Sequence, residues 1–273
     1  PETDGSEPNG SETNGSETDE GETAGSGSDA AETASDADSA RTNGSALERT
    51  FDASDGLNDR ELAALVARTA ARVEAVRCLS FESVPTVRVV NRSSVRERQR
   101  RAVGDRPVSV RRFDDARLST ALLLGDDVNA SEARAATTAT ATLGYYDAAA
   151  DSIVVVAEDG TASGVDEPTL AHELVHALQD QHFDLERFDA NRTDGALAER
   201  ALIEGDATLV AHRYRTRCAA GDWATECLEA STGADTNSEH LGLELFRYHP
   251  YNEGGAYVAS LYADGGWATV DDR

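Results

Sequence analysis

The pattern of apolar and polar residues divides the chain near Leu57. Residues 1–52 are rich in Gly, Ser, Thr, Asp and Glu and hold almost no large apolar side chain. Such a segment has almost nothing to bury, so it cannot offset the entropy that it loses on ordering. We therefore predict a disordered acidic linker or stalk over 1–52, followed by one globular domain over 57–273.

The first apolar stripe of the globular part follows the helical period. Asn58 or Asp59 can cap a helix that runs to about Arg77. The residues that should face the core from this helix are Leu62, Leu65, Val66, Val73 and Val76, with Thr69 as the polar break. Three later stretches with a helical pattern are also predicted to be helices: 112–124, 129–142 and 195–216.

Runs of β-branched residues predict a small sheet. One strand is expected over 84–90, and 145–147 leads through a turn into an apolar strand over 152–156, as in a hairpin. Asp166 can then cap a helix that carries Pro168 in its first turn. The predicted fold class is α+β, mostly helical, with a small mixed or antiparallel sheet.

The helix after Asp166 contains the most distinctive motif of the chain, H-E-x-x-H at 172–176. Residues four apart lie one above the other on a helix, so His172 and His176 can direct two imidazoles at one metal ion. Glu173 is rotated by about 100° and can hold a water without binding the metal itself. Apolar neighbours predict a buried helix, where such polar groups are costly unless they bind a metal.

A catalytic zinc site usually has three protein ligands, and two residues compete for the third place. His182 has the spacing of the long H-E-x-x-H-x-x-G-x-x-H motif of metzincins. However, Gln179 stands where that motif has Gly, and the chain has no Met for the accompanying Met-turn. Glu204 lies among apolar and small residues of the next predicted helix, beside Gly205, which lets another backbone approach. We therefore expect Glu204 to be the third ligand.

Four short segments carry a family signature. They read H-E-L-V-H-A-L-Q-D-Q-H-F-D-L at 172–185, A-L-I-E-G-D-A at 201–207, P-Y at 250–251 and G-G-W at 265–267. Together they resemble the gluzincin-type zinc metallopeptidase-like domain of haloarchaeal surface proteins, over roughly 57–273. The resemblance implies a zincin-like fold, in which the sheet packs on the active-site helix and a second helix supplies Glu204. It also implies one Zn²⁺ on His172, His176 and Glu204, with Glu173 as general base for peptide hydrolysis.

The resemblance leaves supporting roles open. The thermolysin-like pattern has an Asp four residues after the ligand Glu, where this chain has Thr208. Asp180 or Asp206 is then expected to orient a ligand His, or no residue does, and His182 is a further candidate for support of the site. The strand before the metal helix is expected to line the cleft and pair with substrate, unless it is a plain sheet edge. Candidate donors to the oxyanion of hydrolysis are His212, Tyr214, Tyr248 and His249. The family continues beyond Trp267, so a C-terminal part of the domain is expected to be missing.

Composition narrows the setting. The 273 residues carry a formal net charge of −26, all 25 basic residues are Arg, and Met is absent. This acidity argues against nucleic acid or an anionic membrane as partner, and it makes the Arg-rich segment 95–101 a solvated helix face. The composition resembles haloarchaeal proteins, with an ordinary acidic extracellular protein as the alternative. No run of 18 apolar residues could span a membrane. We expect an extracellular or cell-surface protein, anchored through its stalk.

The three cysteines fit export as well. Cys218 and Cys227 flank a short loop and are predicted to form a disulfide. Cys78 follows an amphipathic helix and is expected to be a small buried hydrophobe.

Two functional hypotheses remain. The first is a zinc-dependent peptidase acting on peptide or protein substrates, as endopeptidase or aminopeptidase. The second is a catalytically silent zincin-like surface or binding domain that keeps the metal site. The intact motif with Glu173 favours the first, because a decayed site usually loses one of its residues. A purely structural zinc is disfavoured, since such sites are normally closed by four protein ligands and need no base.

Overall fold

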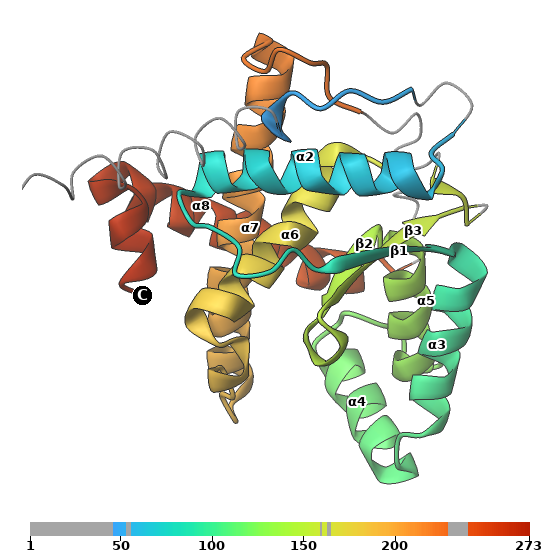
Figure 1. Ribbon diagram of the computed structural model, residues 1–273. Helices are drawn as coiled ribbons and strands as arrows, with labels where there is room; N and C mark the ends of the chain where they lie inside the picture. Colours follow the sequence, from blue (N-terminus) through green and yellow to red (C-terminus); the bar gives the residue numbers. More distant parts are fainter. Residues whose placement is uncertain (1–45, 53–55, 159, 163–164, 229–239) are drawn as a thin grey trace, which may run out of the picture. The chain divides into compact units, whose positions relative to one another are not determined.

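The structure is a computed structural model that describes residues 46–52, 56–158, 160–162, 165–228 and 240–273. Nearly all of the predicted acidic stalk, 1–52, therefore lies outside the described residues. The described part is mostly helical and contains a three-stranded mixed sheet, in agreement with the predicted α+β class (Figure 1). None of its helices is long and apolar enough to cross a membrane.

Helix α2, Asp59–Arg77, forms where the apolar stripe predicts it. Asn58 is the N-cap: its side chain accepts from the N–H groups of Arg60 and Glu61, while the Glu61 carboxylate accepts from the Asn58 N–H. This capping box satisfies amides that the first helical turn leaves without partners. The predicted stripe faces the core, and its buried members are Leu65, Val66, Thr69, Val73 and Val76.

The three helices that follow β1 carry little of the main core. They are α3, Arg92–Gly104; α4, Val108–Thr120; and α5, Ala130–Ala141. The Arg-rich segment falls on α3, where Glu97 pairs with Arg100 and Arg101 at 2.9 and 3.0 Å on an exposed face. The prediction of a solvated helix face is therefore confirmed for this segment.

The sheet has the strand order β1-β3-β2, with β1 at Thr86–Asn91, β2 at Gly144–Asp147 and β3 at Ser152–Ala157. Strands β2 and β3 form the predicted antiparallel hairpin, through the short 3-10 helix Ala148–Ala150, and β1 pairs with β3 in parallel. All six residues of β3 are buried. Both expectations for this strand are wrong: it neither pairs with substrate nor forms a sheet edge, because β1 and β2 occupy its two sides.

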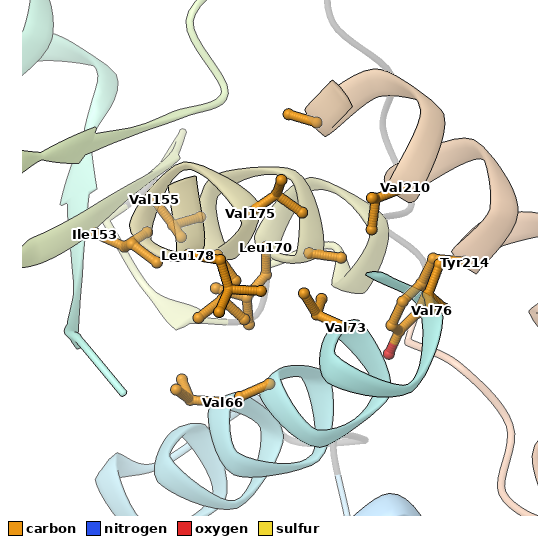
Figure 2. Close-up of a cluster of buried hydrophobic side chains, with 14 of the residues drawn as sticks. Val66, Val73, Val76, Ile153, Val155, Leu170, Val175, Leu178, Val210 and Tyr214 are labelled. Atoms are coloured by element: carbon orange, nitrogen blue, oxygen red, sulfur yellow. The ribbon is translucent and has the colours of Figure 1, made fainter. Parts of the chain in front are cut away.

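Helix α6, Glu167–Phe183, contains the H-E-x-x-H motif and packs against α2, β2 and helix α7, Thr193–Ala220. Figure 2 shows Leu170, Val175 and Leu178 of α6 in the middle of this core. Around them lie side chains of α2, β3 and α7, among them Val66, Val73, Val76, Ile153, Val155, Val210 and Tyr214. The motif helix is therefore held from several sides by elements distant in sequence.

Helices α7 and α8, Leu241–Asp271, form the closest helix pair of the structure. A Cβ atom at Gly254 would lie 2.0 Å from the carbonyl oxygen of Ala201, and one at Gly205 would lie 2.4 Å from the carbonyl oxygen of Gly254. Only glycine fits at such a backbone contact. The two glycines therefore let α8 approach the face of α7 that carries Glu204.

The G-G-W segment ends the long course of α8. Gly265 and Gly266 leave helical geometry, with Gly266 at a φ of 70°. The chain then turns so that Trp267 packs into the core, where its indole N–H donates to the carbonyl of Val76 on α2 at 2.8 Å. The G-G-W segment therefore joins the end of α8 to the end of α2.

Candidate metal centre

Three side chains from two helices converge at one point. His172 Nε2 lies 3.3 Å from both His176 Nε2 and Glu204 Oε2, and His176 Nε2 lies 3.5 Å from the same Glu204 oxygen. Their potential ligand atoms all fall within 4.8 Å of one another. Within the described part of the chain, no fourth His, Cys, Asp or Glu joins this group. The arrangement can hold one metal ion, as the sequence predicts.

The start of the motif helix is fixed by buried charges. Asp166 caps α6 by accepting from the Thr169 N–H at 2.9 Å. The next residue, Glu167, is fully buried and pairs with Arg68 at 2.7 Å and Arg72 at 2.9 Å, both on α2. A buried carboxylate with two guanidinium partners resists displacement, since each partner would otherwise be left with an uncompensated charge. This cluster therefore sets the position of the helix that carries both histidines.

A series of hydrogen-bonded side chains orients His176. Gln179 donates through Nε2 to the carbonyl of Ile203 at 2.9 Å and to Asp206 at 3.1 Å. Its Oε1 therefore faces His176 Nδ1, 2.9 Å away, and accepts the Nδ1–H. That bond leaves His176 Nε2 free to bind a metal. Asp206 is held in turn by Arg77, which is fully buried, at 2.9 Å.

The electrostatics of the metal-free site favour a bound cation. Burial opposes the charged forms, but the hydrogen bonds from His172 and His176 outweigh it and hold the pKa of Glu204 well below its usual range. Burial would likewise lower the pKa of His176, yet the hydrogen bond and charge of Glu204 raise it to about 9. His176 therefore holds a proton at neutral pH when no metal is bound, and a metal ion can replace that proton.

Glu173 lies beside the three ligand residues without joining them. Burial raises its pKa, although the charges of His176 and His172 oppose this shift. A Cβ atom at Gly144 would lie 3.0 Å from Glu173 Cγ, so this glycine allows β2 to pass directly over the carboxylate. A carboxyl group with a raised pKa is a stronger base at neutral pH than an ordinary glutamate.

Tyr251 is a site residue that was not among the donors predicted from the sequence. Its ring stacks on His172 at 6.0 Å between centroids, with 24° between the ring planes. Burial raises the pKa of its hydroxyl, and the nearby charge of Glu204 adds to this. The Pro-Tyr segment of the family signature contains this residue, but nothing in its local sequence separates it from Tyr248. The α7–α8 crossing brings it to the site.

The predicted supporting residues take other places. Asp180 accepts from the Tyr146 hydroxyl at 3.0 Å and from the Leu185 N–H at 3.2 Å, so it fixes the hairpin rather than a ligand His. Asp206 acts through Gln179, as described above. His182 is exposed, and its Nε2 lies 2.8 Å from the carbonyl oxygen of Ser80 in the segment after α2. Its expected support of the site is therefore wrong, and the choice of Glu204 over His182 as third ligand agrees with the observed cluster.

The predicted oxyanion donors divide in the same way. Tyr214 is wrong as a donor, because it is fully buried and donates its hydroxyl to Glu167. His249 is exposed and is not among the residues that line the neighbouring cleft. His212 and Tyr248 do line that cleft, which has a volume of about 640 Å³ and is also lined by His172, Glu173 and Tyr251. Gly144 at the start of β2 forms part of its wall.

The cysteines lie outside the metal centre. Cys218 in the last turn of α7 and Cys227 after the helix form the predicted disulfide. Leu228 follows directly: its N–H donates to the Glu167 carboxylate at 2.8 Å, and its carbonyl accepts from the Glu167 N–H at 2.9 Å. The disulfide therefore supports the start of α6. Cys78 is exposed at the C-cap of α2 in a left-handed conformation, and the expectation of burial is wrong.

Comparison with known proteins does not add to this picture. No protein-family model, no curated protein and no solved structure matches the chain. The resemblance to gluzincin-type domains therefore stays a prediction from the motifs.

Proposed function

We propose that this protein is a zinc-dependent peptidase of gluzincin type, with a zincin-like fold around α6. One observation carries the proposal: a pair of histidines and a glutamate converge at one point, and a separate buried carboxylate lies beside them in a cleft. Three protein donors leave a metal ion with a position for a reactant, as in catalytic sites. The cleft supplies the space for that reactant.

The donor set fits zinc. Two imidazole nitrogens and one carboxylate are a ligand combination that catalytic zinc uses, whereas magnesium and calcium prefer oxygen alone. The bond between Gln179 and His176 Nδ1 supports the fit, because metal-binding imidazoles usually donate their second N–H to a fixed acceptor. When bound, the metal would supply positive charge that acidifies water and polarises a carbonyl group.

Glu173 is the proposed general base. Its raised pKa suits it to take a proton from the attacking water and to return that proton to the leaving amine. The contact between Gly144 and its side chain limits the positions that the carboxylate can adopt. A base held in this way loses little entropy on reaching the reactive geometry.

Tyr251 is the proposed donor to the oxyanion that develops on the scissile carbonyl. It lies on the opposite helix from the base and is stacked on the ligand His172. Its raised pKa keeps the hydroxyl protonated at neutral pH, which a hydrogen-bond donor requires. A single such donor contributes about 10²–10³-fold in kcat in other hydrolases.

The test is a comparison of the full chain with its Glu173→Gln variant, using Glu253→Gln as control because Glu253 is exposed on α8. Zinc content is measured by mass spectrometry, and hydrolysis is followed with a mixture of fluorogenic peptides in low and high salt. We expect equal zinc in all three proteins, with hydrolysis lost only in Glu173→Gln. Tyr251→Phe should keep its zinc and lose most of its turnover, whereas Tyr257→Phe, exposed on the same helix, should keep both.

Each alternative has its own outcome. Full zinc with no hydrolysis by any of these proteins would support the silent binding domain instead. A folded wild type without zinc would contradict both the peptidase and the silent binding domain.

The Cys218–Cys227 disulfide supports an exported protein, because disulfides persist mainly in oxidising compartments.

A further inference from the structure

The cleft beside the metal centre has a charge balance opposite to that of the whole chain. Acidic residues outnumber basic ones by 51 to 25 in the sequence. Among the described residues that line the cleft, Glu173 is the only acid, whereas Arg215 and Arg247 supply two guanidinium groups. A wall of this kind attracts an anionic ligand, even within an acidic protein, because short-range groups decide binding once salt screens the distant charges.

Arg247 on α8 is held in place but lacks acceptors. Its guanidinium carbon lies 4.1 Å from the centre of the Tyr248 ring, a cation–π contact that limits its motion. Its Nε and Nη2 atoms are buried and find no hydrogen-bond partner among the described residues. Buried donors without partners are rare, because each one costs the hydration that it has lost. The side chain therefore gains hydrogen bonds if it turns towards an acceptor in the cleft that it lines.

A smaller cavity that Arg247 also lines has the same character. It has a volume of about 100 Å³, and Arg134 and Arg200 line it together with Arg247, with no acid among its described lining residues. The nearest acids are already engaged: Asp114 pairs with Arg106 at 2.7 Å, and Glu204 faces the histidines and Arg200. Burial lowers the pKa of Arg134, and the charges of Arg117, Arg106 and Arg200 add to this against the opposing effect of Asp114.

The position of Arg247 relates it to the metal centre. Arg247 and Tyr251 are four residues apart on α8 and therefore lie on the same face, about one turn or 6 Å apart. Tyr251 stacks on His172. A ligand group at Arg247 therefore lies in the same cleft as the metal centre, since His172, Glu173, Tyr251 and Arg247 all line it.

We propose that Arg247 forms a subsite that binds a carboxylate of the substrate in the cleft beside the metal centre. The proposal rests on the peptidase function above and narrows its substrates to peptides that are acidic at this position. The carboxylate belongs either to an Asp or Glu side chain or to the C-terminus of the peptide. Both present two oxygens that a guanidinium fork can bind in parallel.

The subsite is tested by binding, without turnover, in the full-length zinc-loaded Glu173→Gln protein. The probes are three dipeptide hydroxamates, whose hydroxamate group binds the metal: Leu-Glu amide, Leu-Gln amide and Leu-Gln with a free carboxylate. Isothermal titration calorimetry gives each Kd. We expect at least one of the two acidic probes to bind about tenfold or more tightly than Leu-Gln amide, as charged hydrogen bonds allow. Preference for Leu-Glu amide identifies a side-chain carboxylate, and preference for the free acid identifies a C-terminal one.

Arg247→Gln, introduced into the same protein, should abolish this preference while leaving the affinity for Leu-Gln amide unchanged. Arg247→Lys, which keeps the charge but not the fork, should retain part of it. Arg60→Gln, at an exposed arginine of α2, is the matched control and should keep all of it. Zinc content and circular dichroism confirm that each variant is folded and loaded.

Equal affinities for all three probes would overturn the subsite, as would a preference that survives Arg247→Gln. Absence of binding by any probe to protein of verified zinc content would overturn it too. These outcomes are independent of hydrolysis, because every protein in this test carries Glu173→Gln. A peptidase without carboxylate preference and a binding domain with one are therefore distinguishable.

Discussion

At the scale of single residues, the metal centre depends on side chains that do not bind the metal. Gln179 is the clearest case. Its sequence position argues against a metzincin, because that family has Gly there, but the structure gives it a positive role in orienting His176. The sequence could not show this, since the donor groups of Gln179 are used by Ile203 and Asp206 on another helix.

Replacing Gln179 by Ala should weaken zinc binding by about 10–100-fold, the usual effect of losing the acceptor that orients a metal-binding imidazole. The affinity is measured by competition with a chromogenic chelator. Gln181→Ala is the control, because Gln181 lies on the same helix but donates to the carbonyl of Ser83 rather than bonding a histidine. An unchanged affinity in Gln179→Ala would show that His176 is held by its packing alone.

At the scale of elements, the site is assembled by two contacts. One is the glycine crossing of α7 and α8, which brings Tyr251 to the histidines. The other is the buried cluster around Glu167, which fixes α6 against α2 and α7. Both are invisible to hydrophobic periodicity, because one uses residues without side chains and the other uses charges that normally face solvent.

Gly254→Ala should force the two helices apart, because the new methyl group would meet the Ala201 carbonyl oxygen at 2.0 Å. We expect a loss of roughly 1–3 kcal/mol in the free energy of unfolding, together with reduced turnover. Urea unfolding and peptide hydrolysis check both effects. Gly104→Ala is the control, since nothing lies within 4 Å of a Cβ atom there. Equal losses of stability in the two variants would contradict the role of the crossing.

Glu167→Gln should be one of the more destabilising single substitutions in the core. It leaves Arg68 and Arg72 buried without their carboxylate, at a cost of roughly 3–5 kcal/mol in the free energy of unfolding. Urea unfolding measures this effect. Glu97→Gln removes an exposed pair instead and should produce no measurable change. A stable Glu167→Gln protein would mean that hydrogen bonding, not charge, holds the start of α6.

At the scale of the whole molecule, metal and protons compete for the same site. In the metal-free protein the pKa of His176 is raised to about 9, against about 6.5 for an unfolded imidazole. The folded state therefore keeps a proton that the unfolded state releases first. The stability that this provides is fully present below about pH 6.5 and is lost as pH rises towards 9.

The raised pKa of His176 can be checked by two measurements, one on the metal-free protein and one during titration with zinc. The free energy of unfolding of the metal-free protein should fall between pH 6.5 and pH 9, and His176→Ala should remove that part of the fall. Zinc binding near pH 7.5 should release a proton, seen by calorimetry in buffers of different ionisation enthalpy, and should tighten as pH rises. Zinc binding without proton release would contradict the raised pKa.

The sequence by itself determined the features that depend on local spacing. Helical period and capping residues predicted α2 and α6, and runs of β-branched residues around a turn predicted the hairpin. The four-residue spacing placed His172 and His176 on one face. The apolar context of Glu204 was also sufficient to select it over His182. These predictions succeed because each depends on residues within a few turns of one another.

Only the tertiary structure decided which distant groups meet. The partners of Gln179, the stacking of Tyr251 on His172 and the burial of Arg68, Arg72 and Arg77 all join elements that lie far apart in the chain. Charged and small residues give no periodic signal for such contacts, because their environment depends on packing rather than on local pattern. The H-E-x-x-H helix supplies the two histidines and Glu173, and the packing of α2, α7 and α8 around it makes them part of a candidate metal site.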